Sequence, residues 1–170
     1  MKHLITGGSG FVGSYLRELS RHKKNFNFVS LGKSSKNDIQ IDLSKDSISL
    51  NEPYGFVIHC ASLVHSSSHS STFDSKLILY DLNITMNLIK SLKNNPFKKL
   101  IFLSSVSVYG LDNGKQISLS EKINPNNGYG FSKYLSEKLL LELIPPEKLL
   151  ILRLPLINGP NPKGNIKRAI

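Results

Sequence analysis

The first turn of the sequence reads Thr6-Gly7-Gly8-Ser9-Gly10-Phe11-Val12-Gly13. It follows the short apolar segment Leu4–Thr6 and precedes a stretch in which apolar residues recur at helical spacing. The pattern G-x-G-x-x-G starts at Gly8, and the related pattern G-x-x-G-x-x-G starts at Gly7. Glycines in a strand-to-helix turn let the backbone approach a pyrophosphate, to which the helix N-terminus offers free N–H groups. This position favours a dinucleotide-binding loop over an ordinary turn.

Apolar segments alternate with helical periodicity along the rest of the chain. The predicted strands are Leu4–Thr6, Phe28–Leu31, Ile39–Ile41, Phe56–His59, Lys99–Leu103 and Leu149–Leu152. The predicted helices begin at Phe11 or cover Ile78–Leu92 and Tyr129–Leu143. Strands that are apolar nearly throughout are typical of a parallel sheet covered on both faces. The expected fold class is therefore α/β, a Rossmann-like doubly wound parallel sheet.

Composition limits the class of protein. The 170 residues fit one domain at ~150 residues per domain. The single cysteine excludes an internal disulfide framework and a Cys-rich zinc site, and no metal site is predicted. No apolar run reaches the ~18 residues of a membrane span, and the N-terminus does not read as a secretory signal. We expect a soluble protein in a reducing, cytoplasmic setting.

The net charge is +10, from 22 Lys and Arg against 12 Asp and Glu. A basic surface can bind nucleic acid or anionic lipid. The lysines are scattered, however, and aromatic residues do not interleave with them to form a stacking platform. Nucleic acid is therefore an unlikely partner, and a phosphate-bearing small molecule is favoured over it.

A candidate catalytic group lies further along the chain. Tyr129 and Lys133 are four residues apart in a predicted helix, so their side chains share a face. A free tyrosine has a pKa of ~10, which a nearby ammonium lowers. Such a tyrosine can exchange a proton with a sugar hydroxyl or carbonyl. The hydroxyl of Ser105, at the end of a predicted strand, can hydrogen-bond the same oxygen.

These segments together resemble the extended short-chain dehydrogenase/reductase family, of the NAD-dependent epimerase/dehydratase type. Two residues separate Gly7 from Gly10, as in that family, and the resemblance covers essentially the whole chain. It implies an NAD(P)-dependent oxidoreductase or epimerase acting on a nucleotide-sugar, with Ser105, Tyr129 and Lys133 as catalytic residues. A dehydratase is least favoured, because no Asp-Glu pair follows Ser105.

The resemblance extends to the expected cofactor contacts. Asp42-Leu43 matches an acidic-apolar pair that contacts adenine, with a helix cap as the alternative reading of Asp42. In His59-Cys60-Ala61-Ser62, small residues let the cofactor pass, and His59 is expected to be structural. A gapless register places Asp81 on the family's first Asn, and Thr85 and Asn87 on its Thr and second Asn. Asn83 fits the first Asn only with a shift, so neither is assigned as a contact. The implied contacts are Gly7, Gly8, Gly10, Phe11, Val12, Gly13, Gly32, Lys33, Ser34, Asp42, Leu43, Cys60, Ala61, Ser62, Tyr129, Lys133 and Pro155.

The second predicted strand indicates which cofactor is bound. An NAD site typically has a carboxylate ~20 residues beyond the glycine loop, which accepts hydrogen bonds from the ribose 2′-OH. Gly32 stands there, and we expect it to leave room for a 2′-phosphate. Lys33 can supply a charge-assisted contact, and Ser34 or Ser35 a hydroxyl donor. NADP is therefore predicted to be preferred over NAD, unless this segment is only a solvated loop.

The predicted organisation is a dinucleotide-binding domain over 1–157 and the start of a truncated substrate-binding region over 158–170. Family members continue into a substrate-binding half, which implies truncation here. A non-catalytic cofactor sensor, an RNA-binding protein or a fragment that only binds cofactor remain alternatives. Relatives pair through two helices, which implies a homodimer of the full-length form. In the last predicted helix, Leu140 and Ile144 lie off the apolar stripe Leu135/Leu139/Leu143 and offer a second apolar face.

Overall fold

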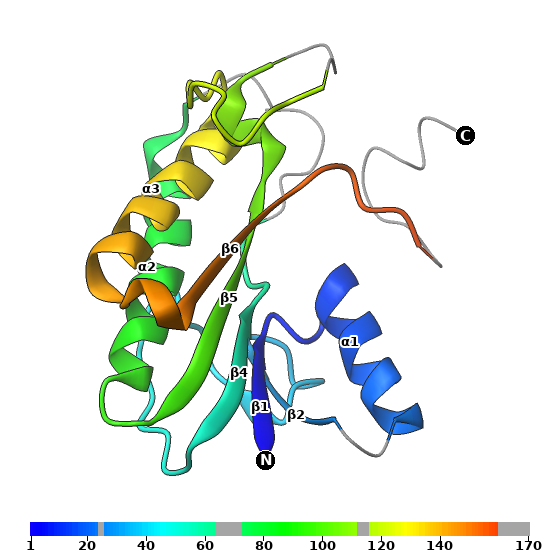
Figure 1. The fold of residues 1–170 in the computed structure, drawn as a ribbon. Coiled ribbons are helices and arrows are strands. Elements are labelled where there is room, and N and C mark those ends of the chain that lie inside the picture. Colours follow the sequence, from blue (N-terminus) through cyan, green and yellow to red (C-terminus); the bar gives the residue numbers. More distant parts are fainter. Residues whose placement is uncertain (24–25, 64–72, 112–115, 160–170) are drawn as a thin grey trace.

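The computed structural model describes residues 1–23, 26–63, 73–111 and 116–159. Its centre is a six-stranded sheet in the order β3-β2-β1-β4-β5-β6, and all neighbouring strands are parallel (Figure 1). The strands are β1 (Lys2–Thr6), β2 (Asn27–Gly32), β3 (Ile39–Gln40), β4 (Tyr54–His59), β5 (Phe97–Ser105) and β6 (Leu149–Leu154). This is the predicted Rossmann-like fold.

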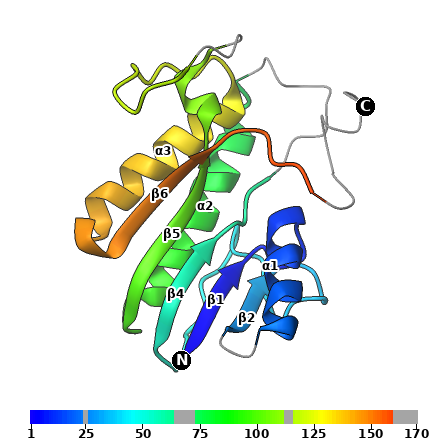
Figure 2. The same cartoon turned by 45° about the vertical axis from the view of Figure 1, so that its right-hand side comes forward.

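Three α-helices flank the sheet in the described part of the chain. They are α1 (Phe11–His22), α2 (Ser75–Leu92) and α3 (Gly128–Leu143), and short 3-10 turns cover Val106–Tyr109 and Pro146–Lys148. Figure 2 shows α1 on one side of the sheet and the packed pair α2 and α3 on the other. All three helices lie where helical periodicity predicted them.

The main hydrophobic core lies between the sheet and the α2/α3 pair. Leu4, Val57, Leu100 and Phe102 project from successive strands toward α2, whose Leu88 is fully buried. Alternate residues of a strand point to the same face, so these positions share one side of the sheet. The core thereby fixes α2 and α3 above the strands whose ends form the site.

The prediction that Leu140 and Ile144 form a second, outward apolar face of α3 is wrong. Leu140 and Ile144, assigned to an oligomer face, are buried in the core with 0% and 7% exposure. Leu143 from the predicted stripe is 46% exposed. The reason is that the inward side of α3 is polar over most of its length, because it carries Lys133 and Glu137 into buried polar clusters.

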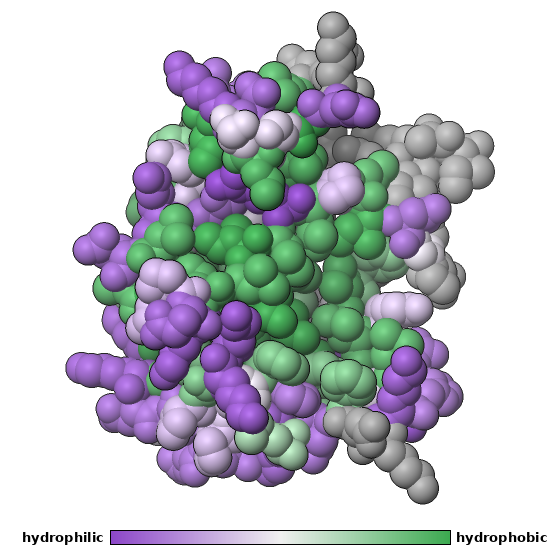
Figure 3. Space-filling view, in the orientation of Figure 1, coloured by the Kyte–Doolittle hydropathy of each residue, from purple (hydrophilic) through white to green (hydrophobic). Residues whose placement is uncertain are grey.

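The opposite face of the sheet is apolar and partly open beyond α1. Phe56 and Leu150 are 39% and 41% exposed, and Ile58, Ile101 and Leu152 are half-buried. The apolar surface over β4, β5 and β6 dominates the view in Figure 3. The predicted domain boundary at 157/158 stays a prediction, since residues 160–170 lie outside the described residues.

The strand order places a crevice at the middle of the sheet. Chain connections run from β1 toward β2 and β3 in one direction, and from β4 toward β5 and β6 in the other. Ligands of open α/β sheets bind beyond the carboxyl ends of the strands, at the point where the order reverses. In this protein that point lies between β1 and β4.

Candidate active site

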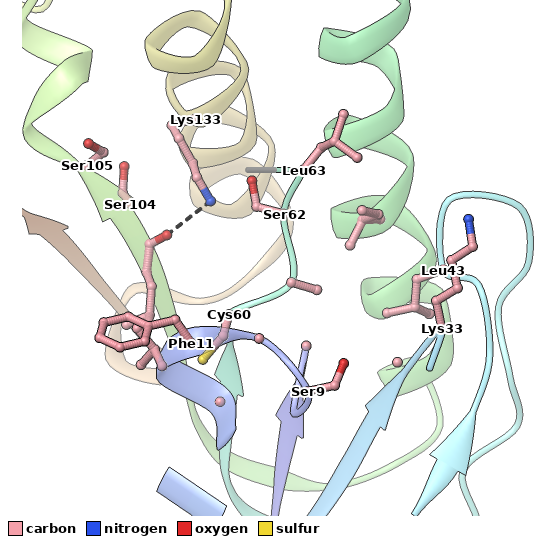
Figure 4. Close-up of a pocket in the computed structure, with 18 of the residues that line it drawn as sticks. Ser9, Phe11, Lys33, Leu43, Cys60, Ser62, Leu63, Ser104, Ser105 and Lys133 are labelled. Carbon is pink, nitrogen blue, oxygen red and sulfur yellow. Dashed lines mark hydrogen bonds between the residues drawn. The ribbon is translucent and has the colours of Figure 1, made fainter. Parts of the chain in front are cut away.

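A cavity of about 690 Å³ lies at that point. It joins the glycine loop, the ends of β2, β4, β5 and β6, and the first turn of α3 (Figure 4). Every predicted site residue except Gly8 lines it. Sequence reasoning missed nine further lining residues, most of which carry no motif and are brought there by the fold: Ser9, Ile41, Leu63, Tyr80, Ile84, Leu103, Ser104, Leu154 and Ile157.

The glycine loop has the shape that a pyrophosphate needs. Gly7 has a φ of +69°, and a side chain on it would come within 2.9 Å of the Ala61 backbone. A Cβ on Gly13 would lie 2.3 Å from the Gly7 carbonyl oxygen, so the helix and the loop touch there. No side chain caps the start of α1 at Gly10, which leaves N–H groups for a ligand. The space beside Gly8 is filled by Ser30, so Gly8 packs the loop and does not line the cavity.

Ser105, Tyr129 and Lys133 converge on the other end of the cavity. The Ser105 side chain hydrogen-bonds the Tyr129 hydroxyl, and the Lys133 ammonium lies 5.7 Å from the centre of the Tyr129 ring. Lys133 Nζ donates a hydrogen bond of 3.2 Å to the carbonyl of Leu103 (Figure 4). The Asn127 side chain caps α3 by accepting a 2.8 Å hydrogen bond from Gly130 N–H, which orients this turn.

The expected lowering of the Tyr129 pKa is wrong for the protein without ligands. Burial and the negative charge of Asp81 raise the Tyr129 pKa, and the hydrogen bond from Ser105 offsets this only in part. Burial also lowers the pKa of Lys133, since its ammonium is removed from water. In this state the tyrosine is therefore held in its protonated, acid form.

His59 is structural, as predicted. Its fully buried ring contacts Thr6 Oγ1 through Nδ1 at 2.7 Å and Thr85 Oγ1 through Nε2 at 3.1 Å. Thr6 Oγ1 also accepts a hydrogen bond of 3.1 Å from Ala61 N–H, so the histidine is tied to the segment after β4. Burial lowers the pKa of His59 to about 3, which keeps the ring neutral.

A buried ion pair joins α3, one turn beyond Lys133, to β6. Glu137 of α3 is 1% exposed and accepts two hydrogen bonds from the Arg153 guanidinium of β6, at 2.7 Å from Nη2 and 3.0 Å from Nε. Ser104 donates to the same carboxylate, and Arg153 also donates to the Tyr109 hydroxyl at 2.8 Å. The pair thus joins α3, β5, β6 and the turn after Ser105.

Asn37 packs beside Gly32 in the region beyond β2. A Cβ on Gly32 would lie 2.9 Å from the Asn37 amide nitrogen, while Gly32 itself lines the cavity. Lys33 is exposed and pairs with Asp42 at 3.4 Å. The Asp42 carboxylate also accepts hydrogen bonds from the hydroxyl and N–H of Ser44. It caps a turn, not a helix, and it lines the cavity as well.

Neither a spanning helix nor a metal cluster is found in the described ranges. No helix there is long and apolar enough to cross a membrane. No group of three or more His, Cys, Asp or Glu side chains within residues 1–23, 26–63, 73–111 and 116–159 could hold a metal ion.

The parallel sheet with its crevice between β1 and β4 defines a protein of the Rossmann-like fold class. The model of the NAD dependent epimerase/dehydratase family matches residues 3–170. The chain belongs to this family.

Two curated relatives illustrate its range. The chain is 32% identical over 174 residues to N-acetyl-alpha-D-glucosaminyl-diphospho-ditrans,octacis-undecaprenol 4-epimerase of Escherichia coli O157:H7, covering 96% of this chain and 51% of that protein. It is 29% identical over 144 residues to GDP-6-deoxy-D-talose 4-dehydrogenase of Aggregatibacter actinomycetemcomitans, covering 82% and 47%. The chain thus spans about half the length of the curated relatives it matches.

Solved structures show the same fold. A UDP-galactose 4-epimerase superposes with a TM-score of 0.72 at 22% identity, over 90% of this chain and 55% of that one. The enzyme WbmG of Bordetella bronchiseptica, in complex with NAD, superposes with a TM-score of 0.71 at 19% identity, over 94% and 55%. At these identities the likeness establishes the fold alone.

Proposed function

We propose that this chain is the cofactor-binding and catalytic part of an NAD(P)-dependent oxidoreductase or epimerase acting on a nucleotide-sugar. The observation that carries the proposal is that Ser105, Tyr129 and Lys133 open into the same cavity as the glycine loop. The family and the sugar-modifying relatives support the class of reaction. A dehydratase remains less favoured, since no acidic pair follows Ser105.

The cavity suits a nicotinamide dinucleotide. The uncapped start of α1 and the glycine loop would hold the pyrophosphate, and Gly32 to Ser34 with Asp42 and Leu43 the adenosine. Tyr129, Lys133 and Pro155 would face the nicotinamide end. The chemistry supplied by a bound nicotinamide is hydride transfer.

The chain's own residues supply the proton chemistry. The Tyr129 hydroxyl would exchange a proton with a sugar hydroxyl or carbonyl oxygen, and the Ser105 hydroxyl would hold that oxygen in place. The Lys133 ammonium would bind ribose hydroxyls and favour the tyrosinate once a ligand displaces water. Because Ser105 already contacts Tyr129, the acid–base pair is preorganised.

A substrate panel tests the proposal. A polypeptide of the relatives' length that carries this chain is incubated with nucleotide-hexoses and a nicotinamide dinucleotide. We expect conversion of at least one nucleotide-hexose, detected by proton NMR of the sugar and by absorbance of reduced nicotinamide. Tight dinucleotide binding with no conversion of any nucleotide-sugar would instead support a cofactor-binding protein without catalysis.

NADP is proposed to bind more tightly than NAD, with Lys33 as the main contact to the 2′-phosphate. The Lys33 side chain is 72% exposed, so exchanging its ion pair with Asp42 for a phosphate costs little. A charge-assisted hydrogen bond contributes about 1.5 kcal/mol, so Lys33→Ala should weaken NADP binding roughly tenfold. The dissociation constants for NADP and NAD are measured by fluorescence titration.

Lys36→Ala is the matched control, because Lys36 is exposed nearby but does not line the cavity. It should leave the NADP to NAD ratio unchanged. NAD binding as tightly as NADP, or a ratio that Lys33→Ala does not alter, would contradict the preference.

A homodimer through α2 and α3 is proposed on the exposed apolar residues of these helices. Leu79 of α2 is 60% exposed, and Leu141 and Leu143 of α3 are 54% and 46% exposed. Burying each such side chain contributes about 1.5–3 kcal/mol, so a second copy is a suitable partner. Light scattering at micromolar concentration should give a dimer, and Leu143→Lys should shift it to a monomer.

The open sheet face could also cause association, so Leu150→Lys serves as the control. Leu150 is 41% exposed on that face, away from α2. A mass that falls with Leu150→Lys and not with Leu143→Lys would assign the contact to the sheet instead.

A further inference from the structure

Lys133 lies in a setting that disfavours its charge. The residue is 4% exposed, and its Nζ contacts the carbonyl of Leu103 and the rings of Phe102 and Tyr129. Among the described residues, no carboxylate oxygen lies within 4.0 Å of Nζ. A buried ammonium without a counter-charge is costly and tends to lose its proton. Some other group must therefore support the charged form.

Two buried carboxylates act on Lys133, those of Asp81 and Glu137. Glu137 is already matched by the guanidinium of Arg153 in a two-pronged ion pair. The remaining titratable neighbours carry no charge at neutral pH. His59 has a pKa of about 3, and burial raises the pKa of the Cys60 thiol to about 12.

Asp81 differs from Glu137 because the three donors that hydrogen-bond it in the described part of the chain are neutral. Its carboxylate accepts from Ser62 Oγ at 2.8 Å, from Leu63 N–H at 2.7 Å and from Ser132 Oγ at 3.0 Å. The residue is 6% exposed on α2. The negative charge of Asp81 can therefore offset the positive charge of Lys133. Its hydrogen bonds join the segment after β4 to the first turn of α3.

We propose that Asp81 is a positioning residue of this site, which serves as the counter-charge of Lys133 and clamps the Ser62–Leu63 segment against the turn between Tyr129 and Lys133. The catalytic meaning rests on the proposed function. The electrostatic pairing itself needs neither substrate nor cofactor.

The pairing is tested by titrating Lys133 in the 170-residue chain. Selective ¹³C labelling of lysine makes its Cε signal visible, and Lys133→Arg identifies the resonance. Removing a nearby negative charge lowers the pKa of an ammonium. We therefore expect Asp81→Asn to move the Lys133 titration to lower pH. Asp46→Asn, the same change at an exposed carboxyl, should leave it in place.

Ser132→Ala distinguishes the effect of the Asp81 hydrogen bonds from the effect of its charge, because it removes one donor and keeps the carboxylate. It should not reproduce the shift. Asp81→Ser is a second neutral variant, in case Asp81→Asn does not fold. An unchanged Lys133 titration in a folded neutral variant, or an equal shift in Ser132→Ala, would overturn the proposal. A failed enzyme assay would leave this result untouched, so the two failures can be told apart.

Discussion

Replacing Tyr129 by phenylalanine is expected to lower turnover by about 10²- to 10⁴-fold, the usual contribution of a positioned general acid or base. The change removes one oxygen atom, which the Ser105 side chain contacts, and leaves the ring beside the Lys133 ammonium. Dinucleotide binding should persist, because the glycine loop lies at the other end of the cavity. Steady-state rates and fluorescence titration of the dinucleotide give the two readouts.

Tyr134→Phe is the matched control on the same helix. Tyr134 does not line the cavity, and its ring lies under the Lys138 ammonium at 5.7 Å. Loss of a hydroxyl outside the cavity should leave the rate unaltered. Turnover in Tyr129→Phe comparable to the parent protein would remove Tyr129 from the mechanism.

The contiguous motifs were predictable from the sequence. The glycine loop, the Tyr129/Lys133 spacing and the strand ending at Ser105 each depend on residues close together in the chain, and all three line one cavity. Apolar periodicity likewise gave six strands and three helices near their observed places. The spacing of residues close together in the chain determines such features. Contacts between distant segments therefore altered these predicted elements little.

The features that sequence reasoning missed depend on distant contacts. Asp81 is bonded to Ser62 and Ser132, which lie 19 and 51 positions away. Asn37 fills the space beside Gly32 only because the loop after β2 folds back. The inner face of α3 could not be identified from its leucines, because Glu137 takes a place that an apolar side chain ordinarily fills. No local signal distinguishes such a helix face.

The Glu137–Arg153 pair should be the most sensitive point of the described fold. Arg153→Met leaves the Glu137 carboxylate buried without its guanidinium, and removing one partner of a buried pair costs roughly 3–5 kcal/mol. Glu137→Gln should cost less, because the Arg153 side chain is 20% exposed and can be hydrated in part. Urea unfolding of the 170-residue chain measures both losses.

The double variant decides between a lost charge partner and lost packing. In Glu137→Gln with Arg153→Met neither member of the pair carries a charge, and the Gln oxygen can still accept from Ser104. If an unpaired charge causes the loss, the double variant should be more stable than Arg153→Met alone. If the two losses simply add, the pair contributes through packing, and α3 and β6 are held together by their apolar contacts.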